Sequence, residues 1–586
     1  MIRLSSLLLN LLTHYVGGRM PTNRTELRVP RITLETVTEV VVVAIVTFLV
    51  LYPVGMLVYG SFRSAAPGAP GYFHLENYLS VFNSPWYLTV FSRTIAVGVV
   101  STTIAVLLGL TSAWIIARTD TPFSGVLHYV AAAPIYTSAF LGAVAWILLA
   151  SPEIGYLNSL AKYLFPFVEG PVFNIYSYWG MVWVMGGFYS PYVFLLVSGA
   201  LKSMDPSLEE VSRLSGANIL QTTLRITLPL VAPAILSAVL LVFVLSIAQF
   251  GIPMVLGWPV NYAVLTTKIF ALLQFPPINY GLGTALSVIL LAITFSIVYL
   301  NSRVIGRRQF ITVTGKGFRP GIVSLGKWRY FTCALCVMYL GIVAVMPLLV
   351  VLVSSFCLYT GRILPLTLEN YVQLVRGLEF PRAFRNSMLI ALVGATMCIL
   401  LATIISWVVN RTRLPGRKII DYICTMQIAI PAVVLGVGML WAWVIFPVGI
   451  YGTIWIMVIA CISHFISYGV RSTSSSLVQI HQELEESSRI CGASWLRTLK
   501  DITLPLLKPG MLSGWTLLFI VFFRELTIVL FLWTPSTITL PVLLYDQWSN
   551  GGYPALSAIG MVQAAVIFVV TFLSEKVLKA PLGRMI

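Results

Sequence analysis

Two stretches of the chain are near copies of each other: LEEVSRLSGA at residues 208–217 and LEESSRICGA at residues 484–493. The similarity resumes with ITLPL at residues 226–230 and 502–506, and it ends with Pro233 and Pro509. Matches that keep one spacing over this length indicate an internal duplication. The two copies lie 276 residues apart, the difference between Glu210 and Glu486.

Each copy predicts a short helix followed by a turn. Ser207 and Glu210 form a capping-box pattern, in which a helix starts and favours acidic residues in its first turn. Gly216 permits a sharp turn after about two helical turns. A second helical piece follows, and Pro229 either separates it from the next apolar run or starts that run. The second copy has Glu483 in place of the capping serine.

The sequence around the two copies consists of apolar runs long enough to cross a membrane, which takes about 20 residues. Hydrophobic residues make up 58% of the 586 residues and charged residues 10%, where soluble domains average about 25% charged. This composition disfavours a soluble enzyme, a disordered scaffold or a fibrous protein. The runs lie near 38–60, 92–117, 126–150, 178–201, 233–257, 282–302, 331–356, 386–409, 424–447, 451–470, 511–533 and 556–578.

The net charge of +17 predicts an orientation in the membrane. In a soluble chain it would suggest nucleic acid as a partner, but here the basic residues gather in alternate loops. The linker 303–330 has seven basic and no acidic residues, and loop 410–423 is also basic. Basic loops stay in the cytoplasm, so both termini are predicted to be cytoplasmic, with the lipid bilayer and not nucleic acid as the partner. Residues 1–37 are interpreted as a cytoplasmic arm and not a cleaved signal.

Further repeats divide the chain. LENY at 75–78 recurs at 368–371, and Arg118 recurs as Arg411, both at a spacing of 293 residues. The drop in spacing to 276 predicts about 17 extra residues in the first half, in its outer loop 151–177. We expect an all-α polytopic membrane protein of about 12 transmembrane helices in two parallel six-helix repeats. The predicted parts are the arm 1–37, a first half 38–302, the linker 303–330, a second half 331–578 and a tail 579–586.

The doubled loop, between the fourth and fifth of six spans, closely resembles the EAA loop of ABC importer permeases. Two copies on one chain resemble the fused permeases of the ferric-iron and thiamine branch of type I, binding-protein-dependent importers. The Glu-Ala-Ala of the family reads Glu-Val-Ser at 210–212 and Glu-Ser-Ser at 486–488, a mild departure. The resemblance implies that each loop is a coupling helix for an ATPase, carried here by Leu208, Glu209, Glu210, Gly216, Ala217, Pro229, Leu484, Glu485, Glu486, Gly492, Ala493 and Pro505.

The resemblance also implies partners and a location. The partners are two copies of a separate ABC ATPase subunit and an extracytoplasmic solute-binding protein. The location is the bacterial inner membrane, which the chain crosses many times.

The chain shows no motif for chemistry of its own. Gly315-Lys316 is followed by Gly317, where a phosphate-binding loop needs Ser or Thr. The five histidines have no metal-ligand spacing. We therefore expect a transport subunit and not an enzyme, with no catalytic residue, metal or cofactor, and with ATP and Mg²⁺ bound by the partner ATPase.

Arg524 and Glu525 stand inside an apolar run, where each charge costs roughly 2.5–3.5 kcal/mol on insertion scales. They should face the interior of the helix bundle, either as a gate or pathway contact or as a structural pair to a neighbouring helix. Gln249 is aligned with Glu525 in the first half and is a weaker candidate for the pathway.

The function that follows is the permease of an ATP-driven importer that works by alternating access. Ferric iron is the favoured solute by resemblance, with thiamine, phosphonate or polyamine as alternatives. A 12-span secondary transporter is the rival of another class, since it too is built from parallel repeats. Against it, the strongest repeat lies in the loops between spans four and five, and no ion-coupling acid stands in both halves.

Overall fold

The computed structural model describes residues 34–167, 169–306, 321–362, 364–412 and 416–576. Most of the N-terminal arm, much of the linker and the C-terminal tail lie outside the described residues. The chain separates into two units, residues 1–44 and 45–586. In the first unit the described residues begin helix α2 (Leu34–Ser61). The account below concerns the second unit.

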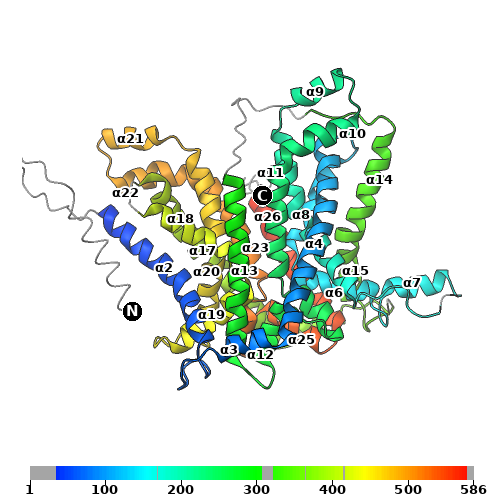
Figure 1. Ribbon diagram of the computed structural model, residues 1–586, viewed down its shortest axis with the longest axis horizontal. Coiled ribbons are helices and arrows are strands. Elements are labelled where there is room, and N and C mark those ends of the chain that lie inside the picture. The colour runs from blue at the N-terminus through cyan, green and yellow to red at the C-terminus, as the bar shows by residue number, and fades with distance from the viewer. Residues whose placement is uncertain (1–33, 168, 307–320, 363, 413–415, 577–586) are drawn as a thin grey trace, which may run out of the picture. The chain divides into compact units, whose positions relative to one another are not determined.

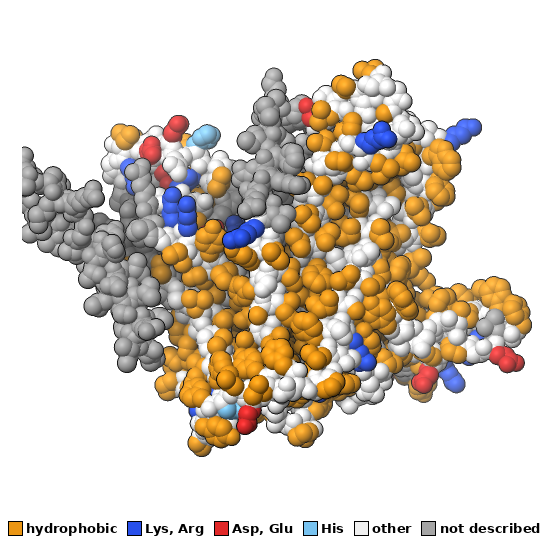
Figure 2. Space-filling model, viewed as in Figure 1, with side chains coloured by type: hydrophobic (Ala, Val, Ile, Leu, Met, Phe, Trp, Pro, Cys, Tyr) orange, Lys and Arg blue, Asp and Glu red, His pale blue; other side chains and the backbone are white. Residues whose placement is uncertain are grey.

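The described residues are almost entirely helical, with only three isolated β-bridges. Ten helices are long and apolar enough to cross a membrane, which confirms an all-α polytopic membrane protein. Figure 2 shows hydrophobic side chains over the flanks of these helices and charged ones gathered toward their two ends. The ten are α2, α4 (Pro85–Arg118), α8 (Tyr178–Ser203), α10 to α11 (Ile219–Ile247), α13 (Tyr280–Gly306), α14 to α15 (Trp328–Ser355), α17 (Glu379–Arg411), α20 (Ile454–Val478), α23 with the turn before it (Leu499–Phe523) and α26 (Tyr553–Lys576).

Two further spans are broken near their middle. Helices α5 (Ser124–Ala132) and α6 (Ala139–Ala150) are bent by 104°, and α18 (Arg417–Met426) and α19 (Ala432–Ile445) by 112°. Counting these two bent pairs as spans gives twelve, six in each half, and a third bent pair at 253–274 would make thirteen. The spans predicted at 126–150 and 424–447 are present, and each is broken by a bend that was not predicted from the sequence. Pro134 and Pro431 stand at the breaks, where a proline lacks the N–H that a continuous helix needs.

The fifth span of each half is shorter than predicted. Helix α11 (Leu228–Ile247) ends ten residues before the predicted end of its run, and α23 (Leu504–Phe523) also ends ten residues early. Short helical pieces follow before the sixth span. In the first half they are a turn at Pro253–Val260 and α12 (Leu265–Gln274), bent by 77°. In the second half they are α24 (Val529–Leu532) and α25 (Leu540–Ser549). Each helix ends just before polar residues: Gln249 follows α11 by two residues, and Arg524 and Glu525 follow α23 directly.

The extra residues of the first half lie where the change in repeat spacing predicts them. Between α6 and α8 stand residues 151–177, which include α7 (Tyr156–Leu164). Between α19 and α20 stand only residues 446–453. The first half is therefore longer on this side by a helix and its loop.

The first span of each half packs against the opposite half. Tyr52 of α2 donates a hydrogen bond to the carbonyl oxygen of Ala442 in α19 (3.1 Å), and Ser463 of α20 donates to Leu49 (2.7 Å). In the other direction, the hydroxyl groups of Tyr339 in α14 and Ser190 in α8 lie 2.5 Å apart. Figure 1 shows α14 beside α4 and α8 of the first half. The two halves are thus interlocked.

The LENY repeat has a structural explanation. It begins two short helices, α3 (Glu76–Asn83) and α16 (Glu369–Arg376). Asn77 donates to the carbonyl oxygen of Ser61 at the end of the first span (2.9 Å), and the Tyr78 hydroxyl bonds the Ser61 side chain (2.7 Å). Asn370 and Tyr371 bind Ser355 in the same way, at 3.0 and 2.8 Å. Each copy satisfies backbone carbonyls where a span ends.

Candidate functional site: two elbows and a cavity between the halves

The duplicated loops fold into two helix–turn elements, here called the first elbow (residues 207–230) and the second elbow (residues 482–506). Their helices are α9 (Ser207–Leu214) and α21 (Gln482–Ile490). Both lie at the same end of the helices in Figure 1.

Each elbow helix ends on a glycine in the left-handed region. The φ angle is +88° at Gly216 and +86° at Gly492. In the first elbow the N–H of Gly216 bonds the Arg213 carbonyl (2.9 Å), and that of Ala217 bonds the Ser212 carbonyl (3.1 Å). This pair of bonds is a Schellman motif, which favours glycine because other residues are strained at such φ. The second elbow repeats both bonds, so the predicted glycine turns are confirmed.

The predicted capping box at the start of the first elbow is wrong. Ser207 is the first helical residue and not the cap, and its backbone N–H bonds the Asp205 carboxylate (2.9 Å). A capping box does form at the start of the next helix, α10 (Ile219–Thr222), where Asn218 and Gln221 bind each other's backbone N–H groups. The elbow therefore has a capped helix on each side of its glycine.

The prolines do not interrupt the second helical piece. Helix α10 continues through one π-helical turn, Thr223–Thr227, into α11, with Pro229 in the first turn of α11. The second elbow has the same turn at Leu499–Thr503 before Pro505. A π turn shifts the hydrogen-bond ladder by one residue, which accommodates a proline that has no N–H to donate. The second helical piece of each elbow, after its glycine, is thereby continuous with the fifth span.

The first acid of each pair is buried in an ion pair. In the first elbow, Glu209 is 4% exposed and binds Arg118, which is 0% exposed at the end of α4. Its other carboxylate oxygen accepts a hydrogen bond from Thr227 in the π turn (2.6 Å). Arg118 also donates to the carbonyl of Leu201 at the end of α8 (3.5 Å). One carboxylate thus connects the second span, the elbow helix and the start of the fifth span.

The second elbow repeats this arrangement. Glu485 lies 3.3 Å from Nε of Arg411, at the end of α17, and accepts a hydrogen bond from Thr503 (3.0 Å). Arg411 donates through Nη2 to the carbonyls of Leu477 (3.0 Å) and Ile480 (2.6 Å). The recurrence of Arg118 as Arg411 was visible in the sequence, but nothing there tied these arginines to the acids of the elbows.

The other acid of each pair faces away from the chain. Glu210 and Glu486 are exposed, so within each pair only the second acid is free to meet a partner. Figure 2 shows hydrophobic side chains over the outer side of α9. Exposed large apolar side chains on the elbow helices α9 and α21 are Leu208, Val211, Leu214, Leu484 and Ile490. Pro229 and Pro505 are also exposed, and Ala217 and Ala493 are half-buried beside their glycines.

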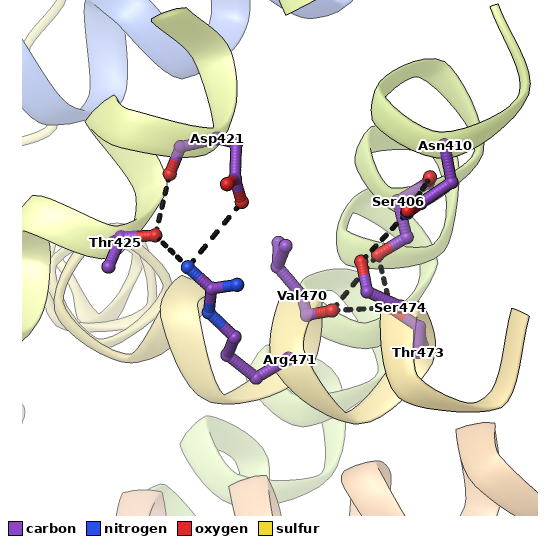
Figure 3. A network of polar contacts seen from close by, with 8 residues as sticks. All are labelled: Ser406, Asn410, Asp421, Thr425, Val470, Arg471, Thr473 and Ser474. Atoms are coloured by element: carbon purple, nitrogen blue, oxygen red, sulfur yellow. Dashed lines mark hydrogen bonds and ion pairs between the residues drawn. The ribbon is translucent and has the colours of Figure 1, made fainter. Parts of the chain in front are cut away.

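A polar seam joins the second and fourth spans of the second half (Figure 3). Ser406 of α17 and Thr473 of α20 have hydroxyl groups 2.6 Å apart, and Asn410 donates to Ser474 (3.1 Å). The equivalent positions of the first half lie 293 residues earlier for α17 and 276 residues earlier for α20, and they hold Ala113, Ala117, Val197 and Ser198. The seam is therefore largely a property of the second half, and it lies close to the Arg411 ion pair.

A cavity of about 470 Å³ lies between the two halves. The three pathway candidates from the sequence, Gln249, Arg524 and Glu525, all line it. Arg524 caps the end of α23 and reaches across to the first half, where its Nη1 donates to the carbonyls of Ile135 and Thr137 at the break between α5 and α6. Arg524 thus both binds the backbone of a neighbouring segment and lines the cavity.

Other polar residues of the cavity were not singled out from the sequence. Aromatic and amide residues in apolar helices give no signal of their own, because most of them serve packing. The polar lining residues that sequence reasoning missed are Ser138, Tyr189, Tyr192, Gln427, His464 and Tyr468. No cluster of three or more metal-ligating His, Cys, Asp or Glu side chains occurs in the described part of the chain.

Comparison with known proteins agrees with these features. A ferric transport system permease protein of Actinobacillus pleuropneumoniae is 27% identical over 549 residues, which cover 90% of this chain and 76% of the relative. A putative ferric transport permease of Haemophilus influenzae is 30% identical over 60% of this chain and 55% of the relative. A putative 2-aminoethylphosphonate permease of Salmonella typhimurium is 28% identical over 40% of this chain and 89% of the relative.

A crystal structure of a bacterial ABC transporter that imports the polysaccharide alginate matches with a TM-score of 0.39 and 18% identity, over 47% of this chain and 96% of that chain. The family described as binding-protein-dependent transport system inner membrane component matches twice, at residues 105–308 and 398–579. The two matches contain the two elbows. The chain belongs to this family of inner-membrane transport components, with two copies of the family's domain fused in one polypeptide.

Proposed function

We propose that the chain is the membrane-spanning permease of an ATP-driven importer of ferric iron. The observation that carries this proposal is the pair of matching elbows, each with an exposed apolar helix held from behind by a buried Glu–Arg pair. Two equivalent docking sites suit two copies of one ATPase subunit, which would bind and hydrolyse ATP with Mg²⁺. The chain itself would act as a transport subunit.

The elbows can transmit movement. Glu209 and Glu485 tie each elbow helix to the ends of the second and fourth spans. The same carboxylates bind Thr227 and Thr503 in the π turns, which are continuous with the fifth span. A displacement of the elbow by a closing ATPase pair would therefore move a whole group of spans. Because the cavity lies between the halves, such a movement would open it alternately to each side. A solute-binding protein on the outer face would deliver the cargo.

The choice of ferric iron rests on the relatives. The ferric permease relatives cover up to 90% of the chain, whereas the phosphonate permease relatives cover 40%. A phosphonate is the second candidate for this reason. The basic inner loops support an orientation with both termini in the cytoplasm.

The test is uptake of radioactive ferric iron by cells that express the chain with its ATPase and binding protein. We expect ATP-dependent uptake that requires all three components. Uptake of 2-aminoethylphosphonate without uptake of iron would replace iron with the second candidate. Uptake that persists without any ATPase would instead favour a secondary transporter.

A further inference from the structure

The cavity holds a guanidinium with unused donors. Arg524 binds the carbonyls of Ile135 and Thr137 through Nη1 alone. Its Nε and Nη2 make no hydrogen bond to the described residues, and the side chain is half-buried against the cavity. Arginine presents its donors in a planar fork that matches the oxygens of carboxylates and phosphates. The unused side of the fork is therefore suited to an oxyanion.

A second set of donors lines the same cavity. Nε2 of Gln249 is buried without a hydrogen-bond partner. Tyr192 and Tyr468 line the cavity too, and neither has a hydroxyl hydrogen bond to the described residues. Buried polar groups without partners are uncommon in proteins, so the Gln249 amide calls for an occupant.

Acceptors stand beside the donors. Glu525 accepts one backbone hydrogen bond, from the N–H of Ile528 (3.0 Å), and makes no ion pair with Arg524 among the described residues. Gln427 is 0% exposed, and its Oε1 has no partner. A carboxylate and an amide oxygen suit a positively charged or proton-donating part of a solute. The cavity thus offers one site for each sign of charge.

A bare trivalent cation does not fit this lining. Such an ion would meet the positive charge of Arg524 with a single carboxylate, Glu525, to balance it, and like charges repel strongly where water is excluded. The same ion becomes suitable when it carries an oxyanion, because the oxyanion can contact Arg524 while the cation faces Glu525. A zwitterion with a phosphonate and an ammonium group presents the same pattern of charge.

We propose that this cavity binds its solute as an oxyanion-bearing species, with Arg524 and Gln249 contacting the oxyanion and Glu525 and Gln427 facing the solute's cationic part. The inference rests on the proposed transport function and names the chemistry of the cargo. Ferric iron complexed by an oxyanion and an organic phosphonate zwitterion are the two solutes that share this chemistry.

The test is equilibrium dialysis with the full-length chain in lipid nanodiscs, without ATPase. The probes are inorganic phosphate, choline, 2-aminoethylphosphonate and ferric iron complexed by citrate. We expect phosphate to bind, choline not to bind, and at least one of the two mixed-charge probes to bind more tightly than phosphate. Which mixed-charge probe binds more tightly distinguishes the two cargo types. Failure of every oxyanion probe to bind at concentrations up to about 10 mM would overturn the proposal.

Variants assign the contacts. Arg524→Gln should weaken binding of every oxyanion probe about tenfold or more, because a charge-assisted hydrogen bond is lost, whereas Arg524→Lys should retain most of it. Glu525→Gln should weaken only the mixed-charge probes. Arg471→Gln is the matched control, since Arg471 follows Tyr468 by one helical turn but pairs with Asp421 (3.6 Å) and lies outside the cavity (Figure 3).

A second variant covers the case in which Arg524→Gln does not fold. Gln249→Glu adds a negative charge to the opposite half and leaves the Arg524 hydrogen bonds in place, and we expect it to weaken phosphate binding about tenfold. Unchanged binding in both Gln249→Glu and Arg524→Gln would overturn the proposal. Since these measurements involve no ATPase and no uptake, their failure would leave ATP-driven iron uptake to be judged separately.

Discussion

Arg118 and Glu209 form a buried ion pair across 91 residues of sequence, with side chains 0% and 6% exposed. Arg411 and Glu485 form its counterpart in the second half. Burying two charges costs several kcal/mol for each ion, so such a pair persists only where partners compensate both charges. Thr227 and Thr503 supply the additional hydrogen bonds. The two pairs explain why these loops resemble each other more than the spans do.

The first prediction concerns the buried acid. Glu209→Ala leaves the guanidinium of Arg118 without a counter-charge, and breaking a buried pair in this way costs about 3–5 kcal/mol. We expect a clear fall in the midpoint of thermal unfolding of the purified chain and loss of ATPase co-purification. Glu485→Ala should act in the same direction in the second half.

Two variants serve as controls for this prediction. Glu210→Ala removes the neighbouring acid, which is exposed, and should leave the unfolding midpoint nearly unchanged. The double variant Arg118→Met with Glu209→Leu removes both charges and should recover much of the stability lost in the single variant. Equal stability of Glu209→Ala and Glu210→Ala would contradict the role of the ion pair.

The second prediction concerns the turn glycines. Gly216→Ala and Gly492→Ala place a side chain at φ values of +88° and +86°, and the left-handed conformation costs roughly 1–2 kcal/mol for residues with a Cβ atom. A Cβ atom would meet nothing within 4 Å at either glycine, so the strain is in the backbone alone. We expect faster hydrogen exchange in α9 or α21, measured by mass spectrometry.

Gly199→Ala is the matched control, because Gly199 also has open space around it but lies inside the helix α8. Alanine in a helix is favoured over glycine by roughly 0.5–1 kcal/mol. Exchange in the elbows should be unchanged in this variant. Slow exchange in all three variants would show that the elbows do not depend on the left-handed turn.

The sequence was sufficient for the twelve spans and the glycine turns, because apolar length and duplicated residues report on local structure. It was insufficient for contacts between distant segments. Glu209 and Glu210 are adjacent residues of the same type, yet tertiary packing buries the first and leaves the second exposed. The breaks near Pro134 and Pro431 were missed for a related reason, since a proline in a transmembrane helix is often tolerated.

The residues of the cavity also show that contacts between distant segments could not be predicted from the sequence. Arg524 and Glu525 could be selected because charges in an apolar run are rare. Gln427 and Tyr468 could not, because their place beside Arg524 in the cavity depends on how separate spans of the second half pack together. No periodicity within a single span carries that information.

The third prediction concerns docking of the ATPase. Glu210→Lys and Glu486→Lys reverse two exposed charges on the faces that we propose to meet the ATPase. We expect the double variant to insert normally but to lose most ATPase co-purification and ATP-dependent uptake, because like charges would then face a surface complementary to acids. Each single variant should lose part of the activity.

Glu169→Lys is the control for this charge reversal. Glu169 is exposed in the loop between α7 and α8, at the opposite end of the spans from the elbows. Glu169→Lys makes the same change in net charge as Glu210→Lys or Glu486→Lys and should leave ATPase co-purification intact. Normal co-purification and uptake in the double variant would remove the elbows from the proposed interface.

The fourth prediction tests orientation and docking with a native cysteine. Cys491 is exposed directly before Gly492 of the second elbow, whereas the six other cysteines are buried or half-buried. If basic inner loops place the elbows in the cytoplasm, a membrane-impermeant maleimide should label Cys491 in inside-out vesicles and not in intact spheroplasts. Cys491→Ser should abolish the signal and so identifies the labelled site.

Added ATPase should slow the labelling of Cys491 several-fold, since the docked subunit would cover the turn. Labelling from the outer side would reverse the proposed orientation, and a rate unaffected by the ATPase would separate Cys491 from the docking surface.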